Sequence, residues 1–324
     1  MVESMPVISV IMSVYSEPLE WIKESIDSIL NQTFKDFEFI IINDNPTRIA
    51  NEDILVKYSQ KDTRITILTN EKNIGLTKSL NRGLSVAKGK YIARMDADDI
   101  SLPERLIEQY NFMEQHTEIG VCGSFIKYFG AKDTIVVYPE KHNQMFLFFM
   151  STFAHPTVFI RREILVKFQL NYNEELRYSQ DYDLWERLYS VTKFHNIQKV
   201  LLHYRISEQQ ISSKYNEKQK KIASEIRRRA FNNYCAQNNI NCFIPIEISQ
   251  KDIINYKSLF LNQQYMNSFD VEEFLYYIYR SVSHERFKTF FYGIKSGDLK
   301  KMPAKYILKI LYCYLRCSQY KLLS

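Results

Sequence analysis

The first hundred residues alternate between short apolar runs and longer segments in which apolar side chains recur every three or four positions. The apolar runs are rich in Ile, Val and Phe, as buried parallel strands are, and they occupy residues 7–15, 37–44, 65–68 and 91–95. Helical spacing separates these runs at residues 19–30, 51–60 and 76–87. Each connection is long enough for a crossover helix, so the pattern predicts an α/β fold with a doubly wound, mostly parallel sheet.

The pattern becomes less regular after this region. Residues 101–105 predict the start of a helix, with Ser101 as its cap and Pro103 in its first turn, and this helix is expected to run to about His116. Further elements are expected at residues 119–125 and 135–138, both strands, at 155–162, a loop that enters a strand, and at 146–150, which fits a helix and a strand equally.

Polar side chains stand where three of the predicted strands end. Tyr15, Asp44 and Asp96 each follow a different strand, and in open α/β sheets ligands bind in the crevice beyond the carboxyl ends of the strands. Asp96 also belongs to a cluster of three carboxylates with Asp98 and Asp99. Carboxylates this close repel one another, and their hard oxygens suit Mg²⁺ or Mn²⁺, which usually share their coordination with phosphate groups. We therefore expect a divalent-metal site that holds a nucleotide diphosphate.

A turn followed by a helix cap is the alternative explanation of these acids, because Asp is favoured in both places. The Asp-x-Asp pattern alone is weak, since the chain has a second one at residues 181–183. Residues 184–188 fit a helix face, which puts Asp181 at the amino end of a helix as either a cap or a general base. Spacing alone favours the cap. His155 precedes a proline, and such a histidine is more often structural than catalytic.

Composition restricts the class of protein. The formal net charge of +6 over 324 residues does not call for nucleic acid, but it suits an anionic ligand or a membrane surface. The five cysteines show no paired metal spacing and fit reduced, cytosolic thiols. We find neither a signal peptide nor an apolar stretch of about 20 residues, and we expect a soluble or peripheral protein. The dinucleotide-binding fingerprint and the P-loop are both absent, so a bound nucleotide would depend on metal for its phosphates.

The last third of the sequence is helical and basic by pattern. We expect a domain of residues 1–212 and a helical C-terminal region of residues 213–324. In a helix that begins at Lys301, basic residues project to one side and apolar residues cover much of the rest, which is an interfacial pattern. Packing of the apolar face onto the first domain explains this pattern equally well.

Seven short segments carry a resemblance to a known family. They are residues 6–15, 43–44, 73–83, 93–99 with their Asp-Ala-Asp-Asp, 155–158, 180–185 and 204–207, and they cover roughly the first 212 residues. Their residues and their order resemble those of the family 2 glycosyltransferases, which are inverting enzymes of the GT-A fold, and in particular the bacterial enzymes of capsule and O-antigen polysaccharide biosynthesis. The resemblance implies a GT-A domain with a helical C-terminal extension.

The resemblance also implies roles for individual residues. The nucleotide sugar would be bound by Tyr15, Asp44, Asp96, Arg94 and Arg205. Within this set, Asp44 would contact the base, and Asp96 would approach the ribose and the metal. Asp98 would ligate the Mn²⁺ or Mg²⁺ that bridges the diphosphate.

Three further positions bear on the resemblance. Asp181 matches the catalytic base of the family, which replaces the cap as its expected role. Asn43 stands where an acid is common, and Ser207 stands where many relatives carry His. The first departure weakens the assignment of the base pocket, and the second removes a metal or pyrophosphate contact.

The reaction implied is transfer of a hexose or N-acetylhexosamine from a UDP-sugar to a hydroxyl of a saccharide linked to undecaprenyl diphosphate. Such an enzyme would be cytoplasmic, with a peripheral contact on the inner face of the cell membrane. Two other hypotheses remain at this point. A metal-dependent nucleotidyltransferase would use the acid cluster but leave Asp181 idle, and a non-catalytic membrane adaptor would depend on the basic tail.

Overall fold

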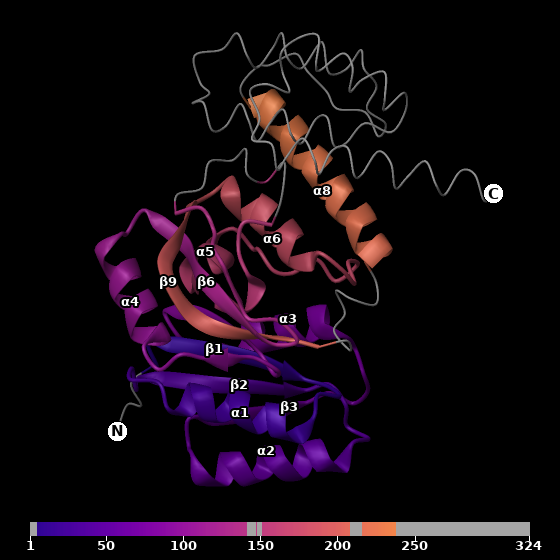
Figure 1. Ribbon diagram of the computed structural model, residues 1–324. Coiled ribbons are helices and arrows are strands. Elements are labelled where there is room, and N and C mark those ends of the chain that lie inside the picture. The colour runs from indigo at the N-terminus through magenta and orange to yellow at the C-terminus, as the bar shows by residue number, and fades with distance from the viewer. Residues whose placement is uncertain (1–4, 141–146, 148–150, 208–215, 238–324) are drawn as a thin grey trace, which may run out of the picture. The chain divides into compact units, whose positions relative to one another are not determined.

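Parallel strands form the first half of the sheet in the computed structural model, which describes residues 5–140, 147, 151–207 and 216–237 (Figure 1). The strands β1 (Ile8–Val14), β2 (Phe37–Asn43), β3 (Ile65–Thr69) and β4 (Tyr91–Asp96) are neighbours in the order β3-β2-β1-β4. All three pairings are parallel. Branched side chains dominate these strands because they fit a pleated surface that is buried on both faces. The four predicted strands are confirmed.

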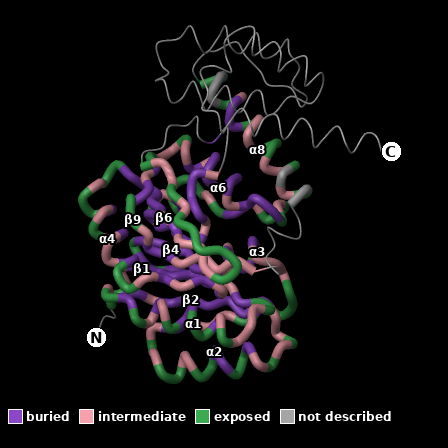
Figure 2. Tube along the Cα trace, viewed as in Figure 1, coloured by how far each residue is buried: buried purple, intermediate pink, exposed green. Residues whose placement is uncertain are grey.

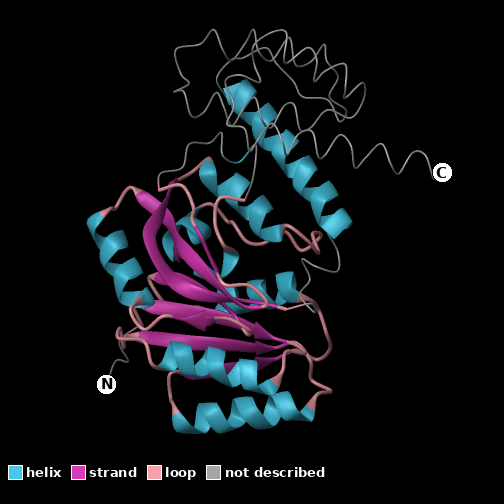
Figure 3. Cartoon of the chain, in the orientation of Figure 1, coloured by secondary structure: helices cyan, strands magenta, loops and turns pink. Residues whose placement is uncertain are grey.

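Helices cover both faces of this half. They are α1 (Leu19–Leu30), α2 (Ile49–Lys61) and α3 (Leu76–Val86), as predicted. Figure 1 shows α1 and α2 on one face of the sheet and α3 on the other, and Figure 3 shows the alternation of helix and strand. Helix α3 packs on β1 and β2. Gly83 permits its close approach, because a Cβ there would lie 2.6 Å from Ile11 Cγ2. The sheet is therefore doubly wound.

Antiparallel and longer strands form the second half. The sheet continues from β4 through β8 (Phe159–Arg161), β6 (Ile119–Gly130), β9 (Lys193–Ile206) and β5 (Ile100–Ser101), and β7 (Thr134–Val136) pairs with β6. The connections include α4 (Arg105–Gln115), the 3₁₀-helix η2 (His155–Thr157), α5 (Arg162–Lys167) and α6 (Gln180–Tyr189). Strand β8 pairs antiparallel with both β4 and β6. The sheet is therefore mixed, and β9 is the long strand that the sequence pattern did not identify.

The predicted cap of helix α4 was wrong by three residues. Ser101 does not cap a helix; it lies in β5, opposite Leu202 of β9, and its hydroxyl accepts a hydrogen bond from Gln32 Nε2 at 3.1 Å. The helix begins at Arg105, after Glu104 at the N-cap position. Pro103 lies before the helix, where its carbonyl accepts a hydrogen bond from Thr33 N at 2.9 Å. Pairing with a strand that is distant in the sequence overrode the local capping signal.

Apolar side chains fill both sides of the central strands. Figure 2 shows β1, β2 and β4 buried, whereas much of α1 and α2 is exposed on the outer side. The core extends from Ile8 and Phe39 to Phe159 and Leu202, and so it is continuous through the parallel and the mixed parts of the sheet. Cys122, within this core, is a free thiol.

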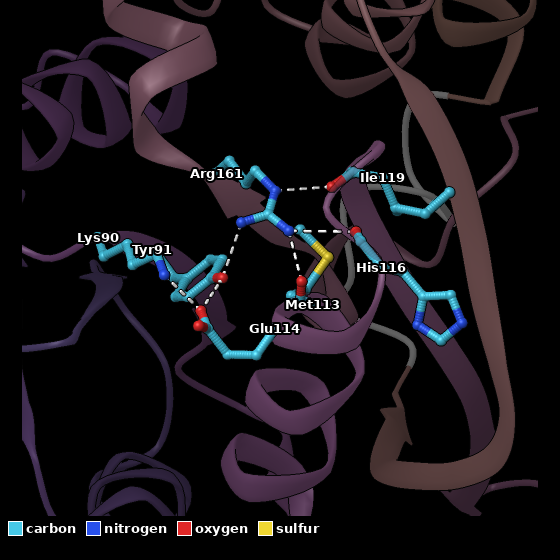
Figure 4. A network of polar contacts seen from close by, with 7 residues as sticks. All are labelled: Lys90, Tyr91, Met113, Glu114, His116, Ile119 and Arg161. Atoms are coloured by element: carbon cyan, nitrogen blue, oxygen red, sulfur yellow. Dashed lines mark hydrogen bonds and ion pairs between the residues drawn. The ribbon is translucent and has the colours of Figure 1, made fainter.

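A buried arginine joins the elements at the amino end of β4. Arg161 donates from Nη1 to the Tyr91 hydroxyl at 2.8 Å, and its other donors reach the carbonyls of Met113, His116 and Ile119 (Figure 4). Glu114 accepts hydrogen bonds from the Tyr91 hydroxyl and from Lys90 Nζ. The guanidinium is charged and buried, and its hydrogen bonds replace the water that it loses. This network fixes the edge of the sheet opposite to the carboxyl ends of the parallel strands.

The chain divides into two compact units, one of residues 1–143 and 151–223 and the other of residues 144–150 and 224–324. The sheet lies in the first unit. Helix α8 (Asn216–Gln237) agrees with the helical pattern expected after residue 213. Of the 146–150 segment only Leu147 is described, and the expected helix from Lys301 lies outside the described residues. Within the described part of the chain, no helix has both the length and the apolar character needed to cross a membrane.

Candidate functional site

Three carboxylates lie together beyond the carboxyl end of β4. Asp96 is the last residue of the strand, and Asp98 and Asp99 follow in the turn that leads to β5. Each of the three side chains has a carboxylate oxygen within 4.8 Å of the others. Asp99 is fully buried, and among the described residues no donor reaches its Oδ2. The three acids that the sequence predicted as a cluster therefore lie together in the structure. Within the described residues, Asp99 Oδ2 is a buried oxygen without a hydrogen-bond partner.

Burial raises the pKa of Asp99 well above its usual range, and the charges of Asp96 and Asp98 raise it further. The backbone N–H of Arg205 and the charge of Arg94 oppose this shift. Several carboxylates that share a site cannot all ionise unless a cation is present. Hard carboxylate oxygens at this spacing are suitable ligands for Mg²⁺ or Mn²⁺, so the donor set fits a divalent ion.

Arg94 lies beneath the acid cluster. It is buried, and its guanidinium forms an ion pair with both oxygens of Asp96. Its backbone is held from two sides, because Arg94 N donates to Val158 O at 3.1 Å and Arg94 O accepts from Arg105 Nη2 at 2.8 Å. The orientation of Asp96 is therefore fixed by a cation that cannot move easily.

Arg205 holds the acidic turn from the side of β9. Its Nε donates to Asp98 O at 2.8 Å, and its backbone N–H donates to Asp99 Oδ1 at 2.9 Å. Its guanidinium forms an ion pair with Glu24 and lies over the rings of Trp21, at 4.7 Å, and Phe129, at 4.3 Å. The structure thus places Arg205 at the turn that carries Asp98 and Asp99.

Asp44 lies at the carboxyl end of β2, in the same edge of the sheet. Its carboxylate is buried and accepts hydrogen bonds from Asn70 Nδ2 at 2.7 Å, Ile74 N at 2.8 Å and Gly75 N at 2.9 Å. Gly75 precedes α3 with a φ of 85°, a conformation that glycine adopts without strain. Asp44 therefore fixes the loop through which the chain enters α3.

Tyr15 follows β1 between these two groups of residues, as the pairing of β1 with both β2 and β4 requires. Its side chain is 43% exposed, and its carbonyl accepts a hydrogen bond from Asn51 Nδ2 at 2.9 Å. An exposed aromatic ring on an anchored backbone offers a surface on which a base can stack. Tyr15, Asp44 and Asp96 thus occupy three neighbouring strand ends, as predicted.

Asp181 is a carboxylate of α6 on which the charges of Arg94 and Asp96 act. It is the second residue of the helix, and the N-cap position belongs to Ser179, whose φ is 56°. Burial raises the pKa of Asp181, and the charge of Asp96 adds to this rise, whereas hydrogen bonds from its own helix backbone and the charge of Arg94 lower it. Arg94 and Asp96 both act electrostatically on Asp181, so its carboxylate lies near the end of β4 that carries the acid cluster.

Asp183 is the other carboxylate of the second Asp-x-Asp pattern, and its surroundings differ. It is buried, and its Oδ2 forms an ion pair with Arg187 Nη2 at 2.8 Å. Two acids of the same short motif are therefore distinguished by their surroundings: Asp183 is paired within the helix, and Asp181 is influenced by the charges at the end of β4.

Sequence reasoning assigned no individual role to Asp99 and did not identify Tyr172. Tyr172 is buried, and its hydroxyl is hydrogen-bonded to His155 Nε2 at 2.7 Å. Asp99 was visible as the third acid of its cluster. Tyr172 lies in a segment without a motif, and only the fold brings it to the crevice.

Comparison with known proteins identifies the family of the chain. The sequence model of Glycosyl transferase family 2 matches residues 9–169. An uncharacterized glycosyltransferase of Methanocaldococcus jannaschii is 42% identical over 208 residues, which are 62% of this chain and 71% of that protein. The O-antigen biosynthesis glycosyltransferase WbnJ of Escherichia coli is 38% identical over 208 residues, which are 61% of this chain and 79% of that protein.

Solved structures show the same fold. The structure of residues 1–349 of S. aureus TarS in complex with UDP has a TM-score of 0.59 at 16% identity, over 95% of this chain and 91% of that chain. The mannosyltransferase PcManGT from Pyrobaculum calidifontis, in complex with GDP-Man and Mn²⁺, has a TM-score of 0.54 at 13% identity, over 96% and 86% of the two chains. The expected GT-A fold is confirmed. The chain belongs to glycosyl transferase family 2, and the protein is a glycosyltransferase.

Proposed function

We propose that the protein is an inverting enzyme of surface polysaccharide assembly, which moves a hexose or N-acetylhexosamine from a UDP-sugar to a hydroxyl of a lipid-linked saccharide. The observation that carries the proposal is a cluster of carboxylates at the end of β4 whose charge acts on a further carboxylate in α6. The cluster of Asp96, Asp98 and Asp99 would suit a metal-bound diphosphate, and Asp181 is the carboxylate in α6. Relatives named for O-antigen and amylovoran biosynthesis, and a similar fold in complex with UDP, support the biological setting.

Asp181 is the proposed general base. In a single displacement the bond between the anomeric carbon and the diphosphate oxygen breaks as the acceptor oxygen forms a new bond from the opposite face. The acceptor hydroxyl loses its proton in this step, and a carboxylate opposite the leaving group can accept it. The raised pKa of Asp181 makes it a stronger base than an exposed carboxylate.

Asp98 and Asp96 are the proposed metal ligands, with the buried Asp99 as a third acid of the same centre. A bound Mn²⁺ or Mg²⁺ would neutralise charge that develops on the departing diphosphate. Arg94 and Arg205 hold this centre in shape through Asp96 and through the turn at Asp98.

Tyr15 and Asp44 form the proposed nucleoside end of the crevice. The exposed ring of Tyr15 would stack on the base, and Asp44 holds the loop before α3 against the same strand edge. The acid at Asp44 already accepts three hydrogen bonds within the protein. A contact with the base would use a lone pair that these bonds leave.

The acceptor is proposed to be a saccharide on undecaprenyl diphosphate, and the enzyme to act at the cytoplasmic face of the membrane. The support is the relatives of O-antigen and amylovoran biosynthesis, together with the interfacial pattern of residues 301–316. A nucleotidyltransferase is not favoured, because it would leave Asp181 without a role.

The proposal is tested by measuring UDP binding with and without Mn²⁺ by calorimetry for the wild type and Asp98→Ala. We expect Asp98→Ala to weaken Mn²⁺-dependent binding at least about tenfold, or about 1.4 kcal/mol. The thermal unfolding midpoint should change little, because the side chain lies in a loop. Asp133→Ala is the matched control, because Asp133 is an exposed carboxylate in the turn between β6 and β7. Equal affinity of the wild type and Asp98→Ala would contradict the metal assignment. A panel of nucleotide sugars, read by nucleotide release, then identifies the donor.

A further inference from the structure

Tyr172 lies in the connection between α5 and α6, and its backbone is fixed between two helices. Its N–H donates to Asn81 Oδ1 at 2.9 Å, and its carbonyl accepts from Asn81 Nδ2 at 2.8 Å, which ties it to α3. The preceding residue, Asn171, accepts a hydrogen bond through its carbonyl from Arg187 Nη2 of α6 at 2.6 Å. The position of Tyr172 is thus set by helices on both sides of it.

The side chain of Tyr172 reaches toward the end of β4. Its hydroxyl is hydrogen-bonded to His155 Nε2 at 2.7 Å. His155 begins η2, and Val158, just after η2, is hydrogen-bonded to the backbone of Arg94 in β4. Two strand residues further on, β4 ends at Asp96. The hydroxyl is therefore held beside the strand that carries the acid cluster.

The same pair contacts the helix that carries the proposed base. The ring of His155 lies edge to face with that of Trp185, with centroids 6.0 Å apart. Trp185 is four residues after Asp181 in α6, and residues at this spacing share one face of a helix. Tyr172 and His155 therefore connect the strand that carries the acid cluster with the helix that carries Asp181.

Electrostatics agrees with this position. Burial raises the pKa of the Tyr172 hydroxyl, and the charges of Arg94, Asp181 and Asp96 all act on it. Burial and the charge of Arg94 lower the pKa of His155 well below its usual range. Both groups are therefore uncharged near neutral pH. One hydrogen bond joins them, and a phenol oxygen can take part in more than one.

We propose that the Tyr172 hydroxyl, oriented by His155, hydrogen-bonds a hydroxyl group of the hexose that the enzyme transfers. This inference rests on the proposed function, because in a single displacement the transferred sugar lies between the leaving diphosphate and the base. Tyr172 is 4% exposed, so its hydroxyl would meet the sugar away from water. A buried polar group that is aimed at one sugar hydroxyl discriminates against sugars that lack it or present it differently.

The test compares Tyr172→Phe with the wild type in Mn²⁺, using UDP and four UDP-sugars: UDP-glucose, UDP-galactose, UDP-N-acetylglucosamine and UDP-N-acetylgalactosamine. We expect UDP affinity to stay within about twofold, because UDP lacks the hexose. Affinity for the preferred UDP-sugar should fall about three- to tenfold, as expected for loss of one hydrogen bond. His155→Phe keeps Tyr172 but removes its hydrogen-bond partner, and it should produce a loss in the same direction. Tyr178→Phe, in the same connection, is the matched control.

Three results would overturn the inference. An equal loss of affinity for UDP and for the UDP-sugar would show that Tyr172 only supports the fold of the site. Unchanged affinity for all four UDP-sugars would show that its hydroxyl does not touch the hexose, and so would binding of UDP without binding of any UDP-sugar. Failure of the wild type to bind UDP in Mn²⁺ is a different outcome, because it defeats the proposed function itself.

Discussion

The two acids at the start of α6 provide the sharpest test of the catalytic assignment. Asp181→Asn and Asp183→Asn make the same chemical change two residues apart in one helix. Their surroundings predict opposite results, because the charges at the end of β4 act on Asp181, whereas Asp183 is paired with Arg187. Each variant is therefore the control for the other.

Asp181→Asn should abolish most of the transfer without weakening the protein. A general base contributes about 10²–10⁴ in rate, and asparagine cannot accept the proton. UDP affinity should be nearly unchanged, since the proposed metal ligands lie on another element. The unfolding midpoint at pH 7 should stay equal or rise, because burial disfavours the charge of Asp181 in the folded state.

The sign of this stability effect depends on pH. Because the folded-state pKa of Asp181 is raised, the folded protein binds a proton there more readily than the unfolded chain does. The charge of Asp181 therefore lowers stability at neutral pH, and this effect disappears as the pH falls through the raised pKa. The gain from Asp181→Asn should shrink in the same range. Transfer by the wild type should fall there too, because the base becomes protonated, so its acid limb lies above the pKa usual for an aspartate.

Asp183→Asn should instead reduce stability and spare transfer. Its carboxylate accepts from Arg187 Nε at 2.9 Å and from Nη2 at 2.8 Å. Hydrogen bonds to charged groups contribute about 1.5–3 kcal/mol, but Arg187 is partly exposed and asparagine keeps one acceptor oxygen. A loss of about 1–2 kcal/mol is the expected result, visible as a lower midpoint in urea.

Transfer is read as UDP release in the presence of the donor found in the panel, and stability is read by denaturation of the same preparations. Persistence of transfer within a few-fold of the wild type in Asp181→Asn would refute the base assignment. Loss of transfer in Asp183→Asn, at unchanged stability, would move the base to that residue.

Two further substitutions test what holds the crevice in place. Arg161→Met should lower the free energy of unfolding by about 3 kcal/mol or more, since Tyr91 and three carbonyls lose their donor. Arg162→Met should have a small effect, and similar denaturation midpoints for the two variants would contradict the role of Arg161 shown in Figure 4. Asp44→Asn should lower the thermal midpoint and UDP affinity together, because an amide has one acceptor oxygen and cannot keep the hydrogen bonds that both carboxylate oxygens accept. Loss of UDP affinity at an unchanged thermal midpoint would show that Asp44 acts only on the nucleotide base.

Local patterns in the sequence were sufficient for the parallel half of the sheet. Strands β1 to β4 are apolar runs with branched side chains, and their connections have clear helical spacing. In such βαβ units the chain itself determines which strands are neighbours and where their ends lie. The convergence of Tyr15, Asp44 and Asp96 could therefore be predicted from the order of the apolar runs alone.

The mixed half depends on pairings that local patterns do not encode. Strand β9 pairs with β6 for most of its length, with register shifts. Strand β5 is only two residues long, and it forms a strand because it pairs with β9. The sequence predicted that Ser101 caps a helix, but in the structure Ser101 belongs to β5. Such a strand pairs with a partner about a hundred residues away, and one of its faces is only partly buried. Its sequence therefore shows no clear alternation of apolar and polar residues.

The proposed catalytic site depends on this non-local half. Asp96 and Asp181 are far apart in the sequence, and spacing favoured a cap at Asp181 until the family resemblance replaced it. Two features of the fold bring their elements together. Strand β8 pairs antiparallel with β4, which places η2 at the end of β4. The chain then returns to α6 through a connection that is hydrogen-bonded to Asn81 and Arg187. Tyr172 and His155 lie on that path. Sequence reasoning was therefore weakest for the residues that connect the elements of the two acids. Selective loss of hexose affinity in Tyr172→Phe would show that these residues also contribute to donor specificity.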